Sequence, residues 1–152
     1  MGNVWRNPWP PPWGARESNL EVTAAAHSAA LWAGLNLIIL LVLSLLVVRQ
    51  RTKHKILFGD GGEPDLARAI RACGNAAEYI PAGIVGIAVL ALAGANVIAV
   101  HVVGLLLFLG RTSHAVGLSR SAGASALRSG GMVLTWVAYI FAAVMLLFSA
   151  MP

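Results

Sequence analysis

One stretch of the sequence places charged and amide side chains at a spacing that could bind a polar ligand. Within residues 71–81, Arg71, Asn75 and Glu78 stand at positions i, i+4 and i+7, which share one face of an α-helix. The twelve residues after Pro81 carry no polar side chain. A carboxylate that leads into such an apolar run is costly to bury and marks a candidate functional site. A polar network that only joins helices is the alternative interpretation.

Three more cationic or titratable side chains are predicted at the same level as this stretch. Arg111 and His114 lie near the end of the third apolar segment, and Arg128 lies at the start of the fourth. Guanidinium groups outnumber the single carboxylate of Glu78, so the cluster is expected to attract an anion. Glu78 and His114 without a third ligand make a poor metal site, and no metal is expected.

The elements that must position these residues are four apolar segments. The chain of 152 residues is 58% hydrophobic and only 11% charged, and its mean hydropathy is +0.75, which favours lipid as the surrounding solvent. The segments are continuous rather than alternating, so helices are predicted and strands are not. We therefore expect an all-α integral membrane bundle of four transmembrane helices, with one membrane domain over residues 23–152. The segments are residues 23–48, 69–93, 96–118 and 130–150.

An amino-terminal arm, residues 1–22, precedes this domain. It holds four of the seven prolines and three of the five tryptophans, and it is predicted to be non-helical because proline breaks helices. It lacks the apolar core of a signal peptide. We expect it to act as a tether.

The placement of basic residues predicts the orientation in the membrane. Nine of the eleven Lys and Arg residues lie in, or next to, the links between the first and second and between the third and fourth segments. By the positive-inside rule both links are cytoplasmic and both termini lie outside, which means periplasmic in a Gram-negative host. The basic pI is therefore a topology signal, and no nucleic-acid module accompanies it. The nine residues are Arg49, Arg51, Lys53, Lys55, Arg68, Arg71, Arg111, Arg120 and Arg128.

The residues of the second segment are also familiar as a family pattern. Residues 71–81, with Arg71, Asn75, Glu78, Tyr79 and Pro81, resemble the second-helix signature of the MAPEG family, the membrane-associated proteins of eicosanoid and glutathione metabolism. The resemblance covers residues 24–150 and is strongest to the bacterial inner-membrane branch of the family. Matching third- and fourth-helix motifs are Gly110-Arg111, His114-Ala115 and Arg128-Ser129.

This resemblance implies a homotrimer that holds glutathione, as a co-substrate, between neighbouring subunits on the cytoplasmic side. The implied activity is that of a glutathione transferase or peroxidase acting on lipophilic electrophiles or lipid hydroperoxides. Arginine forks suit the two carboxylates of glutathione, and a carboxylate suits its ammonium. Arg128 would be catalytic by stabilising the glutathione thiolate. The implied binding residues are Arg71, Asn75, Glu78, Tyr79, Arg111 and His114, with Arg49 or Arg51 reaching in from the neighbouring subunit.

Two departures from the family pattern bear on turnover. Leu118 and Met132 stand where the eicosanoid enzymes have tyrosines, so hydroxyl groups that could contact glutathione are absent. A non-catalytic membrane scaffold is therefore an alternative function. A small proton-coupled multidrug transporter using Glu78 is a weaker one, because Arg71 lies on the same helical face and the basic cluster lies at one side of the membrane.

Overall fold

The computed structural model describes residues 13–120 and 123–151, and their regular elements are all helical. Each of the four helices is long and apolar enough to cross a membrane. The predicted all-α class and the four membrane-length helices are therefore confirmed. The helices are α1 (Trp13–His54), α2 (Pro64–Leu92), α3 (Val97–Arg120) and α4 (Ala126–Ser149).

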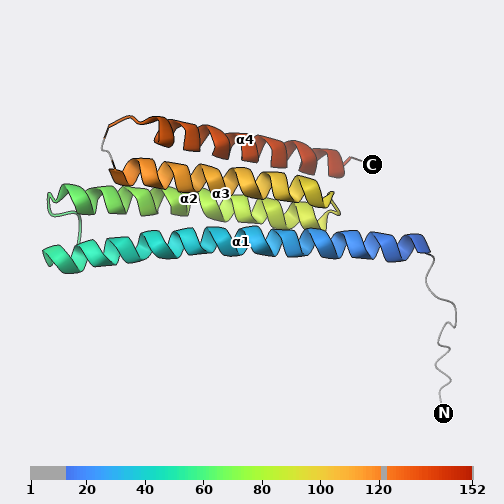
Figure 1. Ribbon diagram of the computed structural model, residues 1–152, viewed down its shortest axis with the longest axis horizontal. Helices are drawn as coiled ribbons and strands as arrows, with labels where there is room; N and C mark the ends of the chain where they lie inside the picture. The colour runs from blue at the N-terminus through green and yellow to red at the C-terminus, as the bar shows by residue number, and fades with distance from the viewer. Residues whose placement is uncertain (1–12, 121–122, 152) are drawn as a thin grey trace, which may run out of the picture.

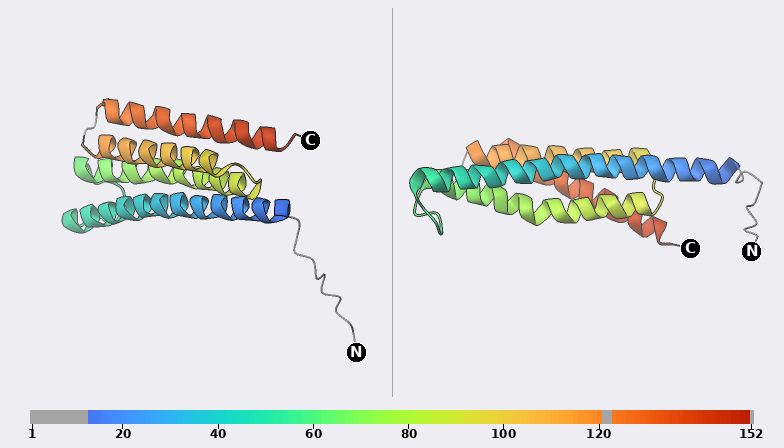
Figure 2. Two further views of the ribbon diagram at one scale, coloured as in Figure 1. Left: turned by 45° about the vertical axis from the view of Figure 1, so that its right-hand side comes forward. Right: turned by 90° about the horizontal axis from the view of Figure 1, so that it is seen from below.

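The helices α2 and α3 form a central pair, and α1 and α4 lie on opposite sides of this pair (Figures 1 and 2). The beginning of α1 and the end of α4 lie at one end of the bundle, whereas the α1–α2 and α3–α4 links lie at the other (Figure 1). We refer to the second end as the basic end, because the two links and the adjoining helix ends carry most of the Lys and Arg residues. Which side of the membrane the basic end faces stays a prediction.

The first helix is longer at both ends than the sequence predicted. It begins at Trp13, so the prediction that the arm is non-helical is wrong for residues 13–22, and residues 1–12 lie outside the described part of the chain. The reason is that the prolines of the arm end at Pro12, and every residue from Trp13 to the end of α1 has a backbone N–H to donate. At its other end α1 continues through the basic residues to His54.

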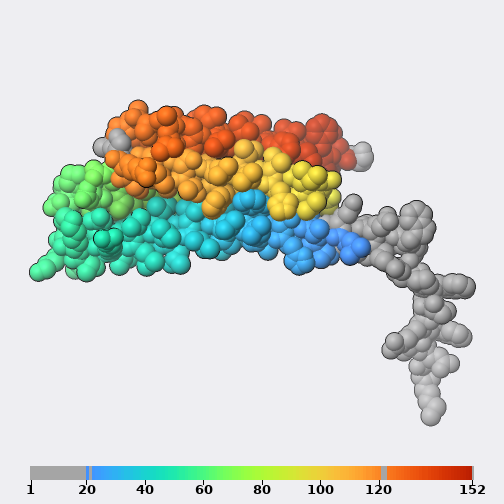
Figure 3. Space-filling model, viewed as in Figure 1, coloured from blue at the N-terminus to red at the C-terminus, as the bar shows by residue number. Residues whose placement is uncertain are grey.

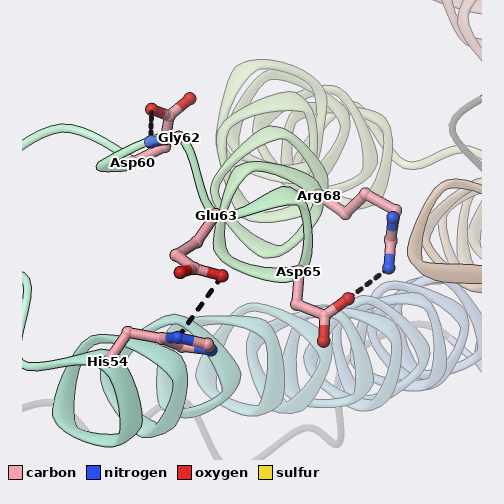
Figure 4. Close-up of polar contacts among 6 residues, drawn as sticks. All are labelled: His54, Asp60, Gly62, Glu63, Asp65 and Arg68. Atoms are coloured by element: carbon pink, nitrogen blue, oxygen red, sulfur yellow. Dashed lines mark hydrogen bonds and ion pairs between the residues drawn. The ribbon is translucent and has the colours of Figure 1, made fainter.

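The link between α1 and α2 is a compact polar turn (Figure 4). His54 Nδ1 lies 3.4 Å from a Glu63 carboxylate oxygen, and the Gly62 amide donates to the Asp60 side chain at 3.1 Å. Arg68 pairs with Asp65 within the first turns of α2. The helix α2 starts at Pro64, ahead of the apolar segment that begins at residue 69, because proline suits the first helical position.

Close backbone approach between α3 and α4 depends on glycine. A Cβ on Gly110 or Gly117 of α3 would lie 2.9 Å from Gly131 O or 2.7 Å from the Arg128 amide nitrogen, respectively, both on α4. A Cβ on Gly131 would in turn lie 2.5 Å from the His114 amide nitrogen. These three glycines therefore let the two helices touch at the basic end, where the candidate site lies.

Candidate functional site

A pocket of about 800 Å³ opens at the basic end between α2, α3 and α4. One wall is the first half of α2, another is the start of α4, and the end of α3 and the α3–α4 link supply the rest. The sequence-predicted residues that line it are Arg71, Asn75, Glu78, His114 and Arg128.

The α2 wall is the helical face that the sequence predicted. Arg71, Gly74, Asn75 and Glu78 line the pocket from successive turns, and Arg71 and Glu78 are exposed. Gly74 leaves room between the longer side chains, since a Cβ there would meet no atom within 4 Å. Opposite charges thus lie along one wall, with the guanidinium nearer the start of the helix.

The fourth helix contributes more to the pocket than Arg128. Ser129, Met132, Val133 and Trp136 also line the pocket. They recur at i, i+3, i+4 and i+7, the same spacing as the α2 wall, so the signal was present in the sequence. The family resemblance singled out Met132, but the wall as a whole was not predicted because these side chains carry no charge. They give the pocket an apolar wall facing its polar one.

Arg128 is held in the first turn of α4 through its backbone. Its amide donates to the hydroxyl of the N-cap residue Ser125 at 3.3 Å. Its carbonyl oxygen lies 3.0 Å from His114 Nδ1, and a carbonyl only accepts, so Nδ1 carries the proton and donates. This bond ties α3 to the helix that carries Arg128. The Arg128 side chain is left free to line the pocket.

Arg111 lies behind the pocket wall rather than in it. Its side chain is only 1% exposed, and it donates from Nε to Thr135 Oγ1 at 2.9 Å and from Nη1 to Asn75 Oδ1 at 2.8 Å. Its guanidinium carbon lies 4.9 Å from the centre of the Tyr79 ring, which is a cation–π distance. None of the described carboxylates forms an ion pair with it.

The contact with Arg111 fixes the orientation of the Asn75 amide. Because a guanidinium only donates hydrogen bonds, the Asn75 atom facing it is the oxygen. The amide nitrogen of Asn75, with two N–H donors, is therefore the atom left for the pocket. Asn75 can then donate to a carbonyl or carboxylate of a ligand, while Arg111 acts only through it.

Three other residues that the resemblance implied are also away from this pocket in the single chain. Tyr79 packs under Arg111, and its carbonyl accepts a hydrogen bond from the Tyr139 hydroxyl. Arg51 donates from Nη1 to Gly59 O at 3.0 Å within the α1–α2 link. Arg49 is exposed at the end of α1. A role for Arg49 or Arg51 in a neighbouring subunit's site stays a prediction.

A smaller cavity of about 320 Å³ adjoins the pocket and shares Arg71, Leu118 and Arg128 with it. Arg68 adds a third guanidinium there. The site as a whole therefore presents several cations and the one carboxylate of Glu78. Among the described residues no group of three His, Cys, Asp or Glu side chains could hold a metal ion.

Four membrane-length helices define an integral membrane protein, and the ligand-sized pocket at one end of the bundle, lined by both charged and apolar side chains, is its candidate site. The family model of the MAPEG family matches residues 29–148. The chain therefore belongs to the MAPEG family, and the resemblance seen in the sequence is confirmed.

Curated relatives agree with this assignment. The chain is 38% identical over 112 residues to inner membrane protein YecN of Escherichia coli strain K12, a match that covers 74% of this chain and 84% of that protein. Inner membrane protein YecN of Escherichia coli O6:H1 (strain CFT073) matches with the same identity and coverage. The predicted similarity to the bacterial inner-membrane branch is thus also confirmed.

Proposed function

We propose that the protein binds glutathione in this pocket and uses it as a co-substrate. The observation that carries the proposal is the joint presence of Arg71, Glu78 and Arg128 on the pocket wall. Glutathione carries two carboxylates and one ammonium, so Arg71, with Arg68 in the adjoining cavity, suits the carboxylates and Glu78 suits the ammonium, which leaves Arg128 for the sulfur. Membership of a family associated with glutathione metabolism supports the same ligand.

The remaining wall residues fit the rest of such a ligand. The amide nitrogen of Asn75 can donate to a peptide carbonyl of glutathione, because Arg111 occupies the amide oxygen. Met132, Val133 and Trp136 supply apolar surface, which suits a lipophilic second substrate next to the sulfur.

In the proposed reaction Arg128 stabilises the glutathione thiolate by its positive charge. In a transferase reaction the sulfur attacks an electrophilic carbon of the lipophilic substrate, forms the C–S bond, and the leaving group departs with its electron pair. In a peroxidase reaction two glutathione thiols are oxidised to the disulfide while a lipid hydroperoxide is reduced to an alcohol and water. Both reactions use the same thiolate.

We also propose that the protein assembles as a homotrimer around α2. The exposed residues Pro81, Ala82 and Val85 continue the face that carries Glu78, and small side chains favour close packing between membrane helices. Gly83 is instead buried against Leu107 of its own chain. A neighbouring subunit on this face could bring Arg49 or Arg51 to the pocket.

The proposed location is a bacterial inner membrane, with the basic end cytoplasmic and both termini periplasmic. Support comes from the naming of the relatives as inner membrane proteins and from the positive-inside rule. The variant Lys53→Cys, made with Cys73→Ala so that it carries a single cysteine, tests the orientation, since Lys53 is exposed at the basic end. An impermeant thiol reagent should label it in inverted vesicles and not in intact cells, and the reverse result would invert the proposed topology.

The experiment that tests the reaction separates glutathione binding from activation. Titration calorimetry of the detergent-solubilised protein should show binding, and a thiolate ultraviolet band should appear at neutral pH. Arg128→Leu should keep most of the binding and lose the band. Lys55→Gln, which removes a positive charge from the same end outside the pocket, should keep both. A wild-type protein that does not bind glutathione would refute the proposal.

One observation favours a second candidate, a glutathione binder without turnover. Leu118 and Met132 line the pocket, so neither position offers a hydroxyl to the sulfur. If the wild-type protein binds glutathione but shows no thiolate band, the protein is a binder and the transferase or peroxidase assignment is wrong.

A further inference from the structure

A second groove lies on a different part of the molecule, between α1 and α3. Figure 3 shows the face of the bundle on which these two helices meet. The groove holds about 430 Å³ and shares no lining residue with the 800 Å³ pocket. Within one chain the groove and the pocket are therefore separate cavities.

Apart from Thr112 and Ser119, the floor and sides of the groove are apolar over about the length of one membrane leaflet. Leu35, Ile38, Val42 and Leu46 line it from α1, facing Phe108 and other residues of α3. From Leu35 to Leu46 the α1 helix rises about 16 Å at 1.5 Å per residue. This is about half of the roughly 30 Å hydrocarbon core of a bilayer. A single acyl chain lying along α1 would fill this length.

The mouth of the groove is basic. Arg120, the last residue of α3, lines it together with Leu46. Arg120 is exposed, and it forms no ion pair with any carboxylate in the described part of the chain. Arg49 follows Leu46 by three residues, so it continues the same face of α1 about 4.5 Å beyond the apolar lining. Two guanidinium groups thus lie where the apolar groove ends.

We propose that this groove binds one anionic phospholipid, with an acyl chain along the α1–α3 groove and the phosphate at Arg120 and Arg49. A lipid in the leaflet at the basic end has an acyl chain that suits the apolar lining and a phosphate that suits the guanidinium groups. Its headgroup lies at the end of the chain, as the guanidinium groups lie at the end of the groove. Anionic headgroups are attracted to Lys and Arg at the membrane surface. A zwitterionic lipid has the same acyl chains, but its neutral headgroup is attracted less to Arg120 and Arg49. The groove should therefore bind anionic lipids in preference to zwitterionic ones.

Native mass spectrometry of the full chain, with equal amounts of phosphatidylglycerol and phosphatidylethanolamine, tests the headgroup. The wild-type protein should retain more phosphatidylglycerol. Arg120→Gln should reduce that retention about fivefold, as expected for one basic contact at a membrane surface. Lys55→Gln removes the same charge at the exposed end of the link and should have no effect. Equal retention of the two lipids by the wild type, or equal losses in the two variants, would refute the proposal.

A second pair of variants tests the acyl-chain groove. Val42 lines the groove, whereas its neighbour Leu41 does not, and the two side chains are 49% and 58% exposed. Val42→Trp should fill the groove and lower lipid retention at least fivefold, and Leu41→Trp should leave it unchanged. If Val42→Trp instead dissociates an oligomer and lipid retention does not change, the groove is a subunit interface and the proposal is wrong. Should Val42→Trp fail to fold, the Arg120→Gln comparison decides alone.

Discussion

The two histidines of α3 lie in the same apolar helix, yet their hydrogen bonds leave them with different chemistry. His101 Nδ1 accepts from the Trp32 indole N–H at 3.1 Å, so the neutral ring carries its proton on Nε2 and donates to Ser28 Oγ at 3.0 Å. His114 has the opposite arrangement, with its Nδ1 donating to the Arg128 carbonyl. Both ring nitrogens of His101 form hydrogen bonds within the protein. In the described part of the chain His114 uses only Nδ1 in this way, so its Nε2 is available to accept a hydrogen bond from a ligand.

The surroundings of the two rings also differ in how completely their polar groups are paired within the protein. Ser28, the partner of His101, completes its own pairing by donating to Ala24 O at 2.9 Å, so that cluster is a fully paired link between α1 and α3. His114 lies at the pocket, on the helix that also carries the buried cation Arg111. Polar groups at membrane depth must be paired internally. The cluster around His101 meets this requirement alone, while the cluster around His114 leaves donors and charges for a ligand.

The largest expected effect comes from breaking the close α3–α4 contact that holds His114 against Arg128. Gly131→Ala should lower the free energy of unfolding by about 3 kcal/mol, the upper end of overpacking costs, because its Cβ would lie 2.6 Å from the Gly110 carbonyl oxygen. Gly130→Ala is the matched control, since a Cβ at Gly130 meets no atom within 4 Å. Denaturant titration in mixed micelles measures both. Equal stabilities would show that α3 and α4 can separate without cost.

The next effect concerns the ammonium group of glutathione, for which Glu78 is the only carboxylate among the residues that line the pocket. Glu78→Gln should weaken glutathione binding by about 1.5–3 kcal/mol, the value of a hydrogen bond to a charged group, which is roughly a 10- to 150-fold change in Kd. Glu63→Gln removes a carboxylate that pairs with His54 in the α1–α2 link and lies outside the pocket. It should leave the Kd unchanged in calorimetry. A similar Kd for both variants would remove Glu78 from the site.

The smallest effects come from the histidines themselves. His101→Leu should cost about 0.6–2 kcal/mol of stability, as for other polar contacts between membrane helices, and should not change the Kd for glutathione. His114→Leu should cost about 1–3 kcal/mol, because the Arg128 carbonyl loses its donor, and it should also raise the Kd. Unfolding and binding measured on the same samples separate the two roles. A raised Kd in the His101 variant would contradict the comparison.

The sequence predicted the membrane helices and the α2 wall because both follow from local properties. Hydropathy over about 20 residues identifies a membrane span without knowledge of its neighbours. Likewise, the 3.6-residue period places Arg71, Asn75 and Glu78 on one face of any helix that they form. The α4 wall obeyed the same period, but it was not predicted as a wall because its side chains carry no charge, and only Met132 was singled out, as a departure from the family pattern.

The start of α1 was mispredicted although it too is a local property. The prolines before Trp13 were taken to prevent helix formation over the whole arm, yet proline disrupts only the residues whose hydrogen bonds or backbone angles it constrains. Residues 13–22 contain no proline. The helix could therefore begin as soon as the last proline was passed.

The sequence by itself determined that four apolar helices carry a cationic cluster with one carboxylate at their basic end. Only the tertiary structure decided which members of that cluster face a ligand. Arg111 and Arg128 are both arginines at the same level, but α3 packs against α4 through Gly110 and Gly131, which leaves Arg111 enclosed with Thr135 and Asn75. Arg128, in the first turn of α4, lies at the pocket wall. Helix rotation and the distance between helices depend on packing across the whole bundle, and neither is encoded in the spacing of residues along one helix.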